Sequence, residues 1–181
     1  VLYQKRHIFP FGMVFSGTEK VTGYWSKFFP DTFVYPNLQL SRVTDFLKQQ
    51  ELNKKHLQNP WSVLLIDDCA FETKLFNSEF FKELFQNGRH YKFWLILSLQ
   101  YPSNISPCLR QNIDYTFIYK NNNINERKKI YENYASVIPS FNLFCAIMNE
   151  ITNDYTALVI NNLSQSTDFQ DCIFWFKAQP F

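Results

Sequence analysis

The sequence predicts an α/β fold in which a largely parallel sheet is flanked by helices. Two short runs, Val63–Ile66 and Phe93–Leu99, are almost entirely apolar, as expected of strands that are buried on both faces of a parallel sheet. Segments with helical periodicity alternate with these and other short apolar runs, and strand–helix alternation indicates α/β architecture. The 181 residues, 46% of them hydrophobic, suffice for one full-sized core, so we expect a single domain over residues 1–181.

The first half of the chain divides at turn and cap residues. Its expected strands are short apolar runs bounded by turn signals: Phe11–Ser16, Phe33–Tyr35, Val63–Ile66 and Phe93–Leu99. Its expected helices are Ser41–Gln58 and Asn77–Gln86. Ser41 is a candidate N-cap of the first helix, and Asn77-Ser78 of the second. The first helix should end at Asn59-Pro60, and the second at Asn87-Gly88, a C-cap signal.

The second half continues the alternation. The expected strands are Tyr115–Lys120, Thr156–Ile160 and Cys172–Lys177, and the expected helices are Asn125–Tyr134 and Ser140–Ile151. Ile105–Gln111 is expected to form a short helix or a turn. Continuous apolar runs favour a parallel sheet. We therefore expect one sheet that contains the strands around Val14, Leu64, Ile96 and Phe117.

Composition excludes several classes of protein. A hydrophobic content of 46% excludes general disorder, and no apolar run reaches the roughly 18 residues that a membrane span needs. The net charge of +2 gives no overall argument for nucleic-acid binding, so any DNA contact must come from a local patch. The cysteines are widely spaced, without a Cys-x-x-Cys pair, which predicts reduced thiols in an intracellular protein: Cys69, Cys108, Cys145 and Cys172.

Polar side chains follow the two central apolar runs at the point where each ends. Asp67 and Asp68 follow the first run, and Gln100 follows the second. Ligands of open α/β sheets bind at the carboxyl ends of the strands, so we expect these three residues at one edge of the sheet. Two carboxylates suit Mg²⁺ when phosphate completes its shell. The alternative is structural, because Asp also favours turns and helix N-caps.

Gly12 and Gly17 have the spacing of the glycines in a phosphate-binding P-loop. That loop requires Gly-Lys-Ser/Thr at its end, because the lysine reaches the phosphates. Here Thr18 and Glu19 follow Gly17 instead. The pattern therefore does not predict a P-loop at this position.

The sequence resembles the FtsK–HerA superfamily of P-loop DNA-pumping ATPases and, within it, the poxvirus-type genome-packaging ATPase of large cytoplasmic DNA viruses. Matching segments occur in order and with matching spacing over roughly residues 8–120: Val14–Lys20, Leu64–Asp68, Phe85–Tyr91, and Leu97–Pro102 with its continuation Leu109–Asp114. The resemblance implies a RecA-like (ASCE) P-loop NTPase core. The family's first strand and Walker A loop are missing, so we expect an N-terminally truncated domain.

The missing strand would lie between the Phe93 strand and the Tyr115 strand in the family topology. Without it, the sheet would have a gap unless another strand takes its place. The late strands Thr156–Ile160 and Cys172–Lys177 are the available substitutes.

The resemblance also implies roles for individual residues. Asp67 resembles the Walker B aspartate that holds Mg²⁺, and Asp68 stands where many relatives have the glutamate that orients the attacking water. Gln100 resembles the polar sensor of the γ-phosphate. Arg89 resembles an arginine finger that acts in the neighbouring subunit's site, and Arg110 is a second candidate for that role.

Structural explanations stay open beside these roles. A cation such as Arg89 is favourable near a helix C-terminus, and Gln100 can serve the turn in which it lies. The basic groups Lys54, Lys55 and His56, or Arg127, Lys128 and Lys129, are candidates for contacts with DNA phosphates. The alternative is that both groups are ordinary solvated helix faces.

Two functions follow from the resemblance. The first is an ATP-driven translocase that uses ATP and Mg²⁺ to package viral double-stranded DNA into the capsid. It implies a homo-oligomeric ring, a hexamer, with capsid or portal proteins as partners, located in the viral factory of the host cytoplasm and in the virion. The second is a non-catalytic, truncated paralogue that serves as a structural or assembly subunit.

Overall fold

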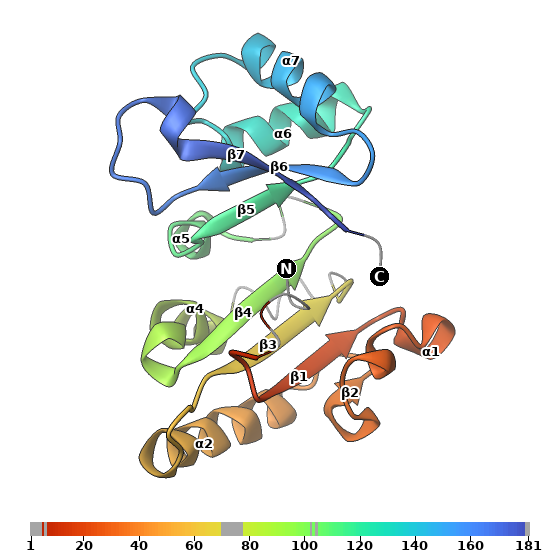
Figure 1. Cartoon of the computed structure of the whole chain (residues 1–181), viewed down its shortest axis with the longest axis vertical. Coiled ribbons are helices and arrows are strands. Elements are labelled where there is room, and N and C mark those ends of the chain that lie inside the picture. Colours follow the sequence, from red (N-terminus) through yellow and green to blue (C-terminus); the bar gives the residue numbers. More distant parts are fainter. Residues whose placement is uncertain (1–4, 6, 70–77, 102, 104, 180–181) are drawn as a thin grey trace. The chain divides into compact units, whose positions relative to one another are not determined.

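The computed structural model (Figure 1) describes residues 5, 7–69, 78–101, 103 and 105–179. Contacts divide the chain into two compact units, Val1–Asn104 and Ile105–Phe181, and each is described by itself. The expectation of a single ATPase domain over residues 1–181 stays a prediction. Within the described residues, no helix is long and apolar enough to cross a membrane.

The first unit contains a parallel four-stranded sheet in the order β2-β1-β3-β4. Its strands are β1 (Phe11–Ser16), β2 (Val34–Tyr35), β3 (Ser62–Asp67) and β4 (Phe93–Ser98). In Figure 1 the arrows of β1, β3 and β4 run in the same direction. The prediction of a parallel sheet with flanking helices is confirmed for this unit.

Alternation along the strands divides the apolar side chains between two faces of the sheet. One face carries Phe93 of β4, which packs against Phe46 of α2 (Leu40–His56) with ring centroids 5.8 Å apart. Gly88 of α4 (Glu79–Tyr91) also lies against the Phe93 ring. Helices α2 and α4 therefore cover this face.

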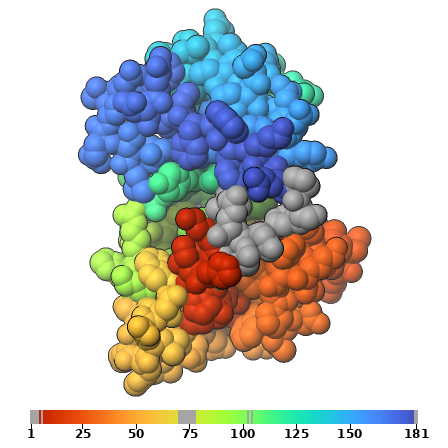
Figure 2. Space-filling view, in the orientation of Figure 1, coloured from red at the N-terminus to blue at the C-terminus, as the bar shows by residue number. Residues whose placement is uncertain are grey.

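The opposite face carries the buried cluster Val14, Val63 and Leu65, against which Trp25 and Phe29 pack. These two aromatic residues come from the connection between β1 and β2, which also contains α1 (Glu19–Thr22), η2 (Trp25–Lys27) and η3 (Asp31–Phe33). The orange atoms of residues 19–35 form one side of the first unit in Figure 2. An aromatic connection, rather than a long helix, thus covers this part of the sheet.

Two predicted helix boundaries were wrong. Ser41 is not the N-cap of α2, because the helix begins at Leu40 and its N-cap, Gln39, makes no side-chain cap bond. Helix α4 does not end at Asn87-Gly88 but continues to Tyr91, where Lys92 takes the left-handed cap position with φ 61°. Packing on Phe93 by Gly88 and by the stacked Tyr91 ring explains why the helix continues. Ser78 is the N-cap of α4 as predicted, accepting a bond from the Phe81 N–H; Asn77 lies outside the described residues.

The second unit contains an antiparallel three-stranded sheet in the order β5-β6-β7. Its strands are β5 (Tyr115–Ile118), β6 (Thr156–Asn161) and β7 (Ile173–Lys177), and its helices are α5 (Pro107–Arg110), α6 (Ile124–Tyr134), α7 (Phe141–Ile151) and η5 (Phe169–Cys172). Side chains from α7 and the sheet, including Phe144, Met148 and Leu158, form its buried core. Except for η5, which was not predicted, each of these elements lies within a few residues of its predicted position.

The prediction that the Phe117 strand joins the parallel sheet was wrong. Phe117 lies opposite Val159 of β6 in an antiparallel ladder. Asn162, just after β6, donates hydrogen bonds to the carbonyl oxygens of Ile113 and Asp114, just before β5. These bonds hold the two strands together where their pairing begins. An apolar pattern identifies a strand but not its partner. The late strands β6 and β7 pair with β5 and with each other, so they do not extend the parallel sheet.

The cysteines agree with the predicted reduced state. All four are thiols rather than disulfides. Cys69 and Cys172 are buried, Cys145 is half-buried, and Cys108 is exposed.

Candidate nucleotide site

The candidate site lies at the carboxyl edge of the parallel sheet. Ser16 ends β1, Asp67 ends β3 and Ser98 ends β4, and the register places these three residues side by side across the sheet. Asp68 leaves β3 with a φ of 50°, in the left-handed region. Gln100 donates from Nε2 to Oδ1 of Asp68 over 2.6 Å. The predicted meeting of Asp67, Asp68 and Gln100 at one edge is confirmed.

Two donors bind the same carboxylate oxygen of Asp67. The Ser16 hydroxyl donates to Oδ2 over 3.1 Å, and the Trp25 indole N–H donates to Oδ2 over 2.9 Å. The hydroxyls of Ser16 and Thr18 lie 3.2 Å apart. A hydroxyl has one proton, so Thr18 is the donor to Ser16 when Ser16 donates to Asp67.

Glu19 holds the turn from which Trp25 reaches the site. Its carboxylate accepts from the backbone N–H groups of Trp25 and Ser26, each over 3.0 Å, and from the Ser26 hydroxyl over 2.8 Å. Burial alone would raise the pKa of Glu19, but these hydrogen bonds to the ionised form outweigh it. The pKa of Glu19 therefore lies below its usual value.

The donor set suits a cation that shares its shell with phosphate. Among the described residues, no three His, Cys, Asp or Glu side chains gather closely enough to hold a metal ion. Asp67, Asp68 and the Ser16 hydroxyl offer hard oxygen atoms, which Mg²⁺ prefers, and Mg²⁺ usually retains waters and substrate oxygens in its shell. The residues thus fit Mg²⁺ bound together with a nucleotide, not a metal ion held by protein alone.

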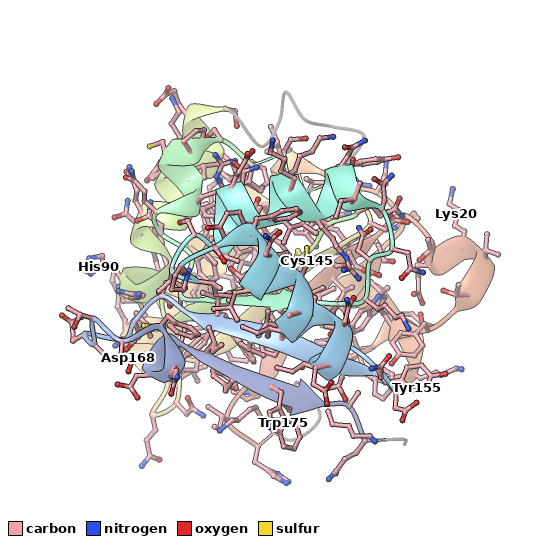
Figure 3. The ribbon with its side chains drawn as sticks, turned by 90° about the horizontal axis from the view of Figure 1, so that it is seen from above. Lys20, His90, Cys145, Tyr155, Asp168 and Trp175 are labelled. Carbon is pink, nitrogen blue, oxygen red and sulfur yellow. The ribbon has the colours of Figure 1, made fainter. Side chains whose placement is uncertain are left out.

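Arg89 lies near the amino ends of the parallel strands, whereas Asp67 lies at their carboxyl ends. It occupies the last turn of α4, just before β4 begins, and its side chain is exposed. Strand β4 has six residues, so at about 3.3 Å per residue its two ends are about 15–20 Å apart. Figure 3 shows His90, next to Arg89, and Lys20 of α1 at opposite ends of the first unit. Arg89 therefore does not meet Asp67 and Asp68 within the first unit.

Arg110 lies in the second unit, where it makes contacts of a structural kind. Its Nη1 donates to the carbonyl oxygen of Ile105 over 2.8 Å. Its guanidinium stands over the Tyr134 ring, 5.7 Å from the centroid. Burial raises the pKa of Tyr134, and the positive charge of Arg110 acts in the opposite direction.

The two candidate groups for DNA contacts differ in exposure. Lys54, Lys55 and His56 are all exposed in the last turn of α2. In the second group, Arg127 is 8% exposed and its Nε donates to the Asn121 carbonyl oxygen. The expectation that Arg127 belongs to a basic surface was therefore wrong, since its guanidinium binds the loop before α6.

Sequence reasoning missed the residues that surround Asp67. Ser16 had a detectable signal, because a polar residue at the end of an apolar strand belongs to the same edge as Asp67. Glu19 and Trp25 had none, since Trp25 is 42 positions from Asp67 and its contact depends on the turn that Glu19 holds.

Solved structures with a similar fold include a viral genome-packaging NTPase. The genome-packaging NTPase B204 of Sulfolobus turreted icosahedral virus 2 in complex with AMPPCP aligns with a TM-score of 0.66 over 98% of this chain and 87% of B204, at 18% identity. Its complex with ATP-γ-S aligns with a TM-score of 0.62 over 97% of this chain and 84% of B204, at 19% identity. At these identities the likeness establishes the fold alone, which is the P-loop NTPase fold.

Sequence comparison identifies relatives in large DNA viruses. Protein 088R of Invertebrate iridescent virus 3 is 42% identical over 181 residues, which span 100% of this chain and 69% of the relative. Protein 075L of Invertebrate iridescent virus 6 is 42% identical over 98% of this chain and 70% of its own length. Protein L437 of Acanthamoeba polyphaga mimivirus is 33% identical over 99% of this chain and 66% of its own length. No family model matches the chain. The chain therefore belongs to the family of large-DNA-virus proteins that includes 088R and 075L.

Proposed function

We propose that this chain is part of an ATP-driven motor that packages viral double-stranded DNA into the capsid. The observation that carries the proposal is the bond between Gln100 and Asp68 beside Asp67, at the carboxyl edge of a parallel sheet. Ligands of such sheets bind at this edge. The fold similarity to packaging NTPases and the relatives in large DNA viruses support the same function.

Each candidate residue has a role in the proposal. Asp67 would hold Mg²⁺, and the bound ion would neutralise charge on the phosphates. Asp68 orients the attacking water, and Gln100 both holds Asp68 and senses the γ-phosphate. Arg89 acts in the site of a neighbouring subunit, which its distance from its own Asp67 favours. We assign Arg110 to the support of the second unit, with a finger role as the alternative.

The wider assignment also belongs to the proposal. It comprises membership of the FtsK–HerA superfamily near the poxvirus-type enzymes, a homohexameric ring, capsid or portal partners, and a location in the viral factory and the virion. DNA contacts through Lys54, Lys55 and His56 are supported by the exposure of all three side chains. Phosphate contacts of this kind weaken steeply as salt concentration rises.

The alternative is a non-catalytic assembly subunit. The specific observation that favours it is the absence of a Gly-Lys-Ser/Thr loop from these 181 residues. A motor needs such a loop, and in the family that the sequence resembles this loop precedes the segments that match this chain. The two functions are separated by testing the protein made from its complete reading frame.

The test is Mg²⁺-dependent ATP hydrolysis by that protein, with and without double-stranded DNA. The motor should hydrolyse ATP, respond to DNA, and lose hydrolysis in Asp68→Ala. A wild-type protein that neither binds nor hydrolyses ATP, yet still assembles with capsid proteins, would establish the alternative.

A further inference from the structure

We infer that Trp25 and Glu19 are positioning residues for the Asp67 carboxylate. The inference deepens the proposed function and rests on it. Trp25 donates its indole N–H to Asp67 Oδ2 over 2.9 Å, and Glu19 fixes the turn that presents the indole. Trp25 would thereby determine which carboxylate oxygen is available to a metal-bound water.

The geometry begins with the alternation of side chains along β3. Val63, Leu65 and Asp67 share one face of the sheet, because successive side chains point to opposite faces. Trp25 packs on that face against the cluster of Val14, Val63 and Leu65. Its indole nitrogen consequently meets Asp67 where the apolar cluster ends and the polar edge begins.

Ser16 completes the arrangement from the neighbouring strand. It is the register partner of Asp67, it lies on the same face as Val14, and it is fully buried. Ser16 and Trp25 both donate to Oδ2. Because both bonds end on the same oxygen, they fix the rotation of the carboxylate, and neither of them involves Oδ1.

Glu19 acts through Trp25 rather than on Asp67 itself. Its bonds go to the backbone N–H groups of Trp25 and Ser26 and to the Ser26 hydroxyl. Glu19 is only 9% exposed, so the turn is anchored from within the protein. Loss of these bonds would release η2 and with it the indole donor.

Residues that orient a metal ligand affect metal affinity although they do not touch the metal. Changing such a residue typically costs about 10–100-fold in metal affinity. We therefore expect Trp25→Phe, which keeps an aromatic ring but removes the donor, to weaken Mg-nucleotide binding about 10-fold. Excess Mg²⁺ should restore nucleotide binding, because the fold and the nucleotide contacts remain.

The first measurement is independent of nucleotide. In ¹⁵N-labelled protein, the Trp25 indole resonance is identified by its loss in Trp25→Phe, among the signals of the four tryptophans. Asp67→Ala and Glu19→Gln should each shift this resonance and leave that of Trp94 in place. An unchanged Trp25 resonance in Asp67→Ala would overturn the inference.

The second measurement is calorimetric binding of Mg-ATP to the protein from the complete reading frame. Trp94→Phe is the matched control, since Trp94 packs on the same apolar cluster from β4, and it should bind like the wild type. Adding Glu19→Gln to Trp25→Phe should cause no further loss, because Glu19 acts through Trp25.

The outcomes separate this inference from the proposed function. If wild-type protein binds no Mg-ATP, the proposed function fails and the positioning of a metal ligand fails with it. If wild-type protein binds Mg-ATP and Trp25→Phe binds equally well at limiting Mg²⁺, only the positioning role is overturned. Weaker binding in Trp25→Phe that excess Mg²⁺ does not restore would likewise reduce Trp25 to a packing residue.

Discussion

Gln100 and Asp68 join the ends of two neighbouring strands through one short side-chain bond of 2.6 Å. Asp68 has a left-handed backbone, φ 50°, which is uncommon outside glycine. Such conformations persist where the surroundings hold them, and they concentrate at functional sites. The hydrogen bond from the Gln100 amide, in the segment after β4, is one contact that stabilises Asp68 in this conformation.

Replacing Gln100 should therefore impair hydrolysis more than nucleotide binding. Gln100→Leu removes the donor to Asp68 while nearly keeping the side-chain size, so Asp68 would lose the orientation that its proposed role with the attacking water requires. We expect kcat to fall by about 100-fold with a small change in Kd for ATP. Gln58→Leu, at an exposed position, is the control. A normal kcat in Gln100→Leu would exclude Gln100 from catalysis.

Arg89→Ala should abolish hydrolysis and leave nucleotide binding nearly intact, because a cation supplied in trans is worth about 10³–10⁵ in rate. Asp67→Ala should weaken Mg-nucleotide binding as well. Arg42→Ala, which removes an arginine that stands over the Tyr35 ring, should retain activity. The measurements are steady-state hydrolysis and equilibrium binding of ATP by the protein from the complete reading frame.

A mixing experiment tests whether Arg89 acts in its own subunit's site or in that of a neighbouring subunit. Arg89→Ala protomers mixed with Asp68→Ala protomers should regain some activity, since some interfaces then combine an intact site with an intact finger. Absence of recovery after confirmed subunit exchange would place the action of Arg89 within its own subunit or in the fold. Full activity of Arg89→Ala alone would remove the finger role.

Gly12→Ala and Gly88→Ala should change stability in opposite directions. A Cβ at Gly12 would lie 2.9 Å from the Val63 carbonyl oxygen and 2.8 Å from the Phe29 ring, so Gly12→Ala should cost about 1–3 kcal/mol. A Cβ at Gly88 would approach the Phe93 ring at 3.4 Å, an ordinary van der Waals distance. Gly88→Ala should stabilise α4 by about 0.5–1 kcal/mol. Urea unfolding of both variants measures the difference, and equal effects would contradict this account of Gly12.

Glu19 should contribute a pH-dependent part of the stability. Its pKa lies below the ordinary 4.5 in the folded protein, so folding favours the ionised form. This stabilisation is present above the unfolded pKa and is lost as the pH falls through the folded pKa. Glu19→Gln should therefore be less stable than wild type at neutral pH.

The measurement is urea unfolding from about pH 7 to about pH 3.5. The difference between Glu19→Gln and wild type should shrink as the pH falls below 4.5, the ordinary value for this group. Glu79→Gln, at a side chain that is 88% exposed, is the control and should show a much smaller difference. A Glu19→Gln difference that stays constant over this pH range would contradict the role of its charge.

Sequence patterns predicted the strands and the sheet edge at which the site lies, because both depend on residues that are close together in the sequence. The apolar runs that end at Asp67 and at Gln100 mark buried strands and their carboxyl ends without knowledge of the partners. The place of Phe117 could not be predicted in this way, since antiparallel pairing with β6 depends on contacts about 40 residues away in the sequence. The continuation of α4 through Gly88 likewise depends on Phe93, which lies outside the helix.

The contact between Trp25 and Asp67 was invisible for the same reason. Nothing in the segment around Trp25 indicates that an indole N–H, rather than another aromatic edge, will reach a carboxylate. The proposed finger roles of Arg89 and Arg110 also depend on assembly, which the sequence suggests only through resemblance. Their positions in the fold nevertheless differ, because Arg89 is exposed in α4 whereas Arg110 contacts Ile105 and Tyr134.

Strand β4 ends the sheet order β2-β1-β3-β4, so among the described residues of the first unit its outer edge has no strand partner. Its sequence is FWLILS, and residues 94–97 are half-buried rather than buried. Apolar edges of this kind readily pair with other chains. A fragment limited to residues 1–104 should consequently self-associate into β-rich aggregates as its concentration rises, so its solubility, and not only its folding, would govern whether the first unit can be handled alone.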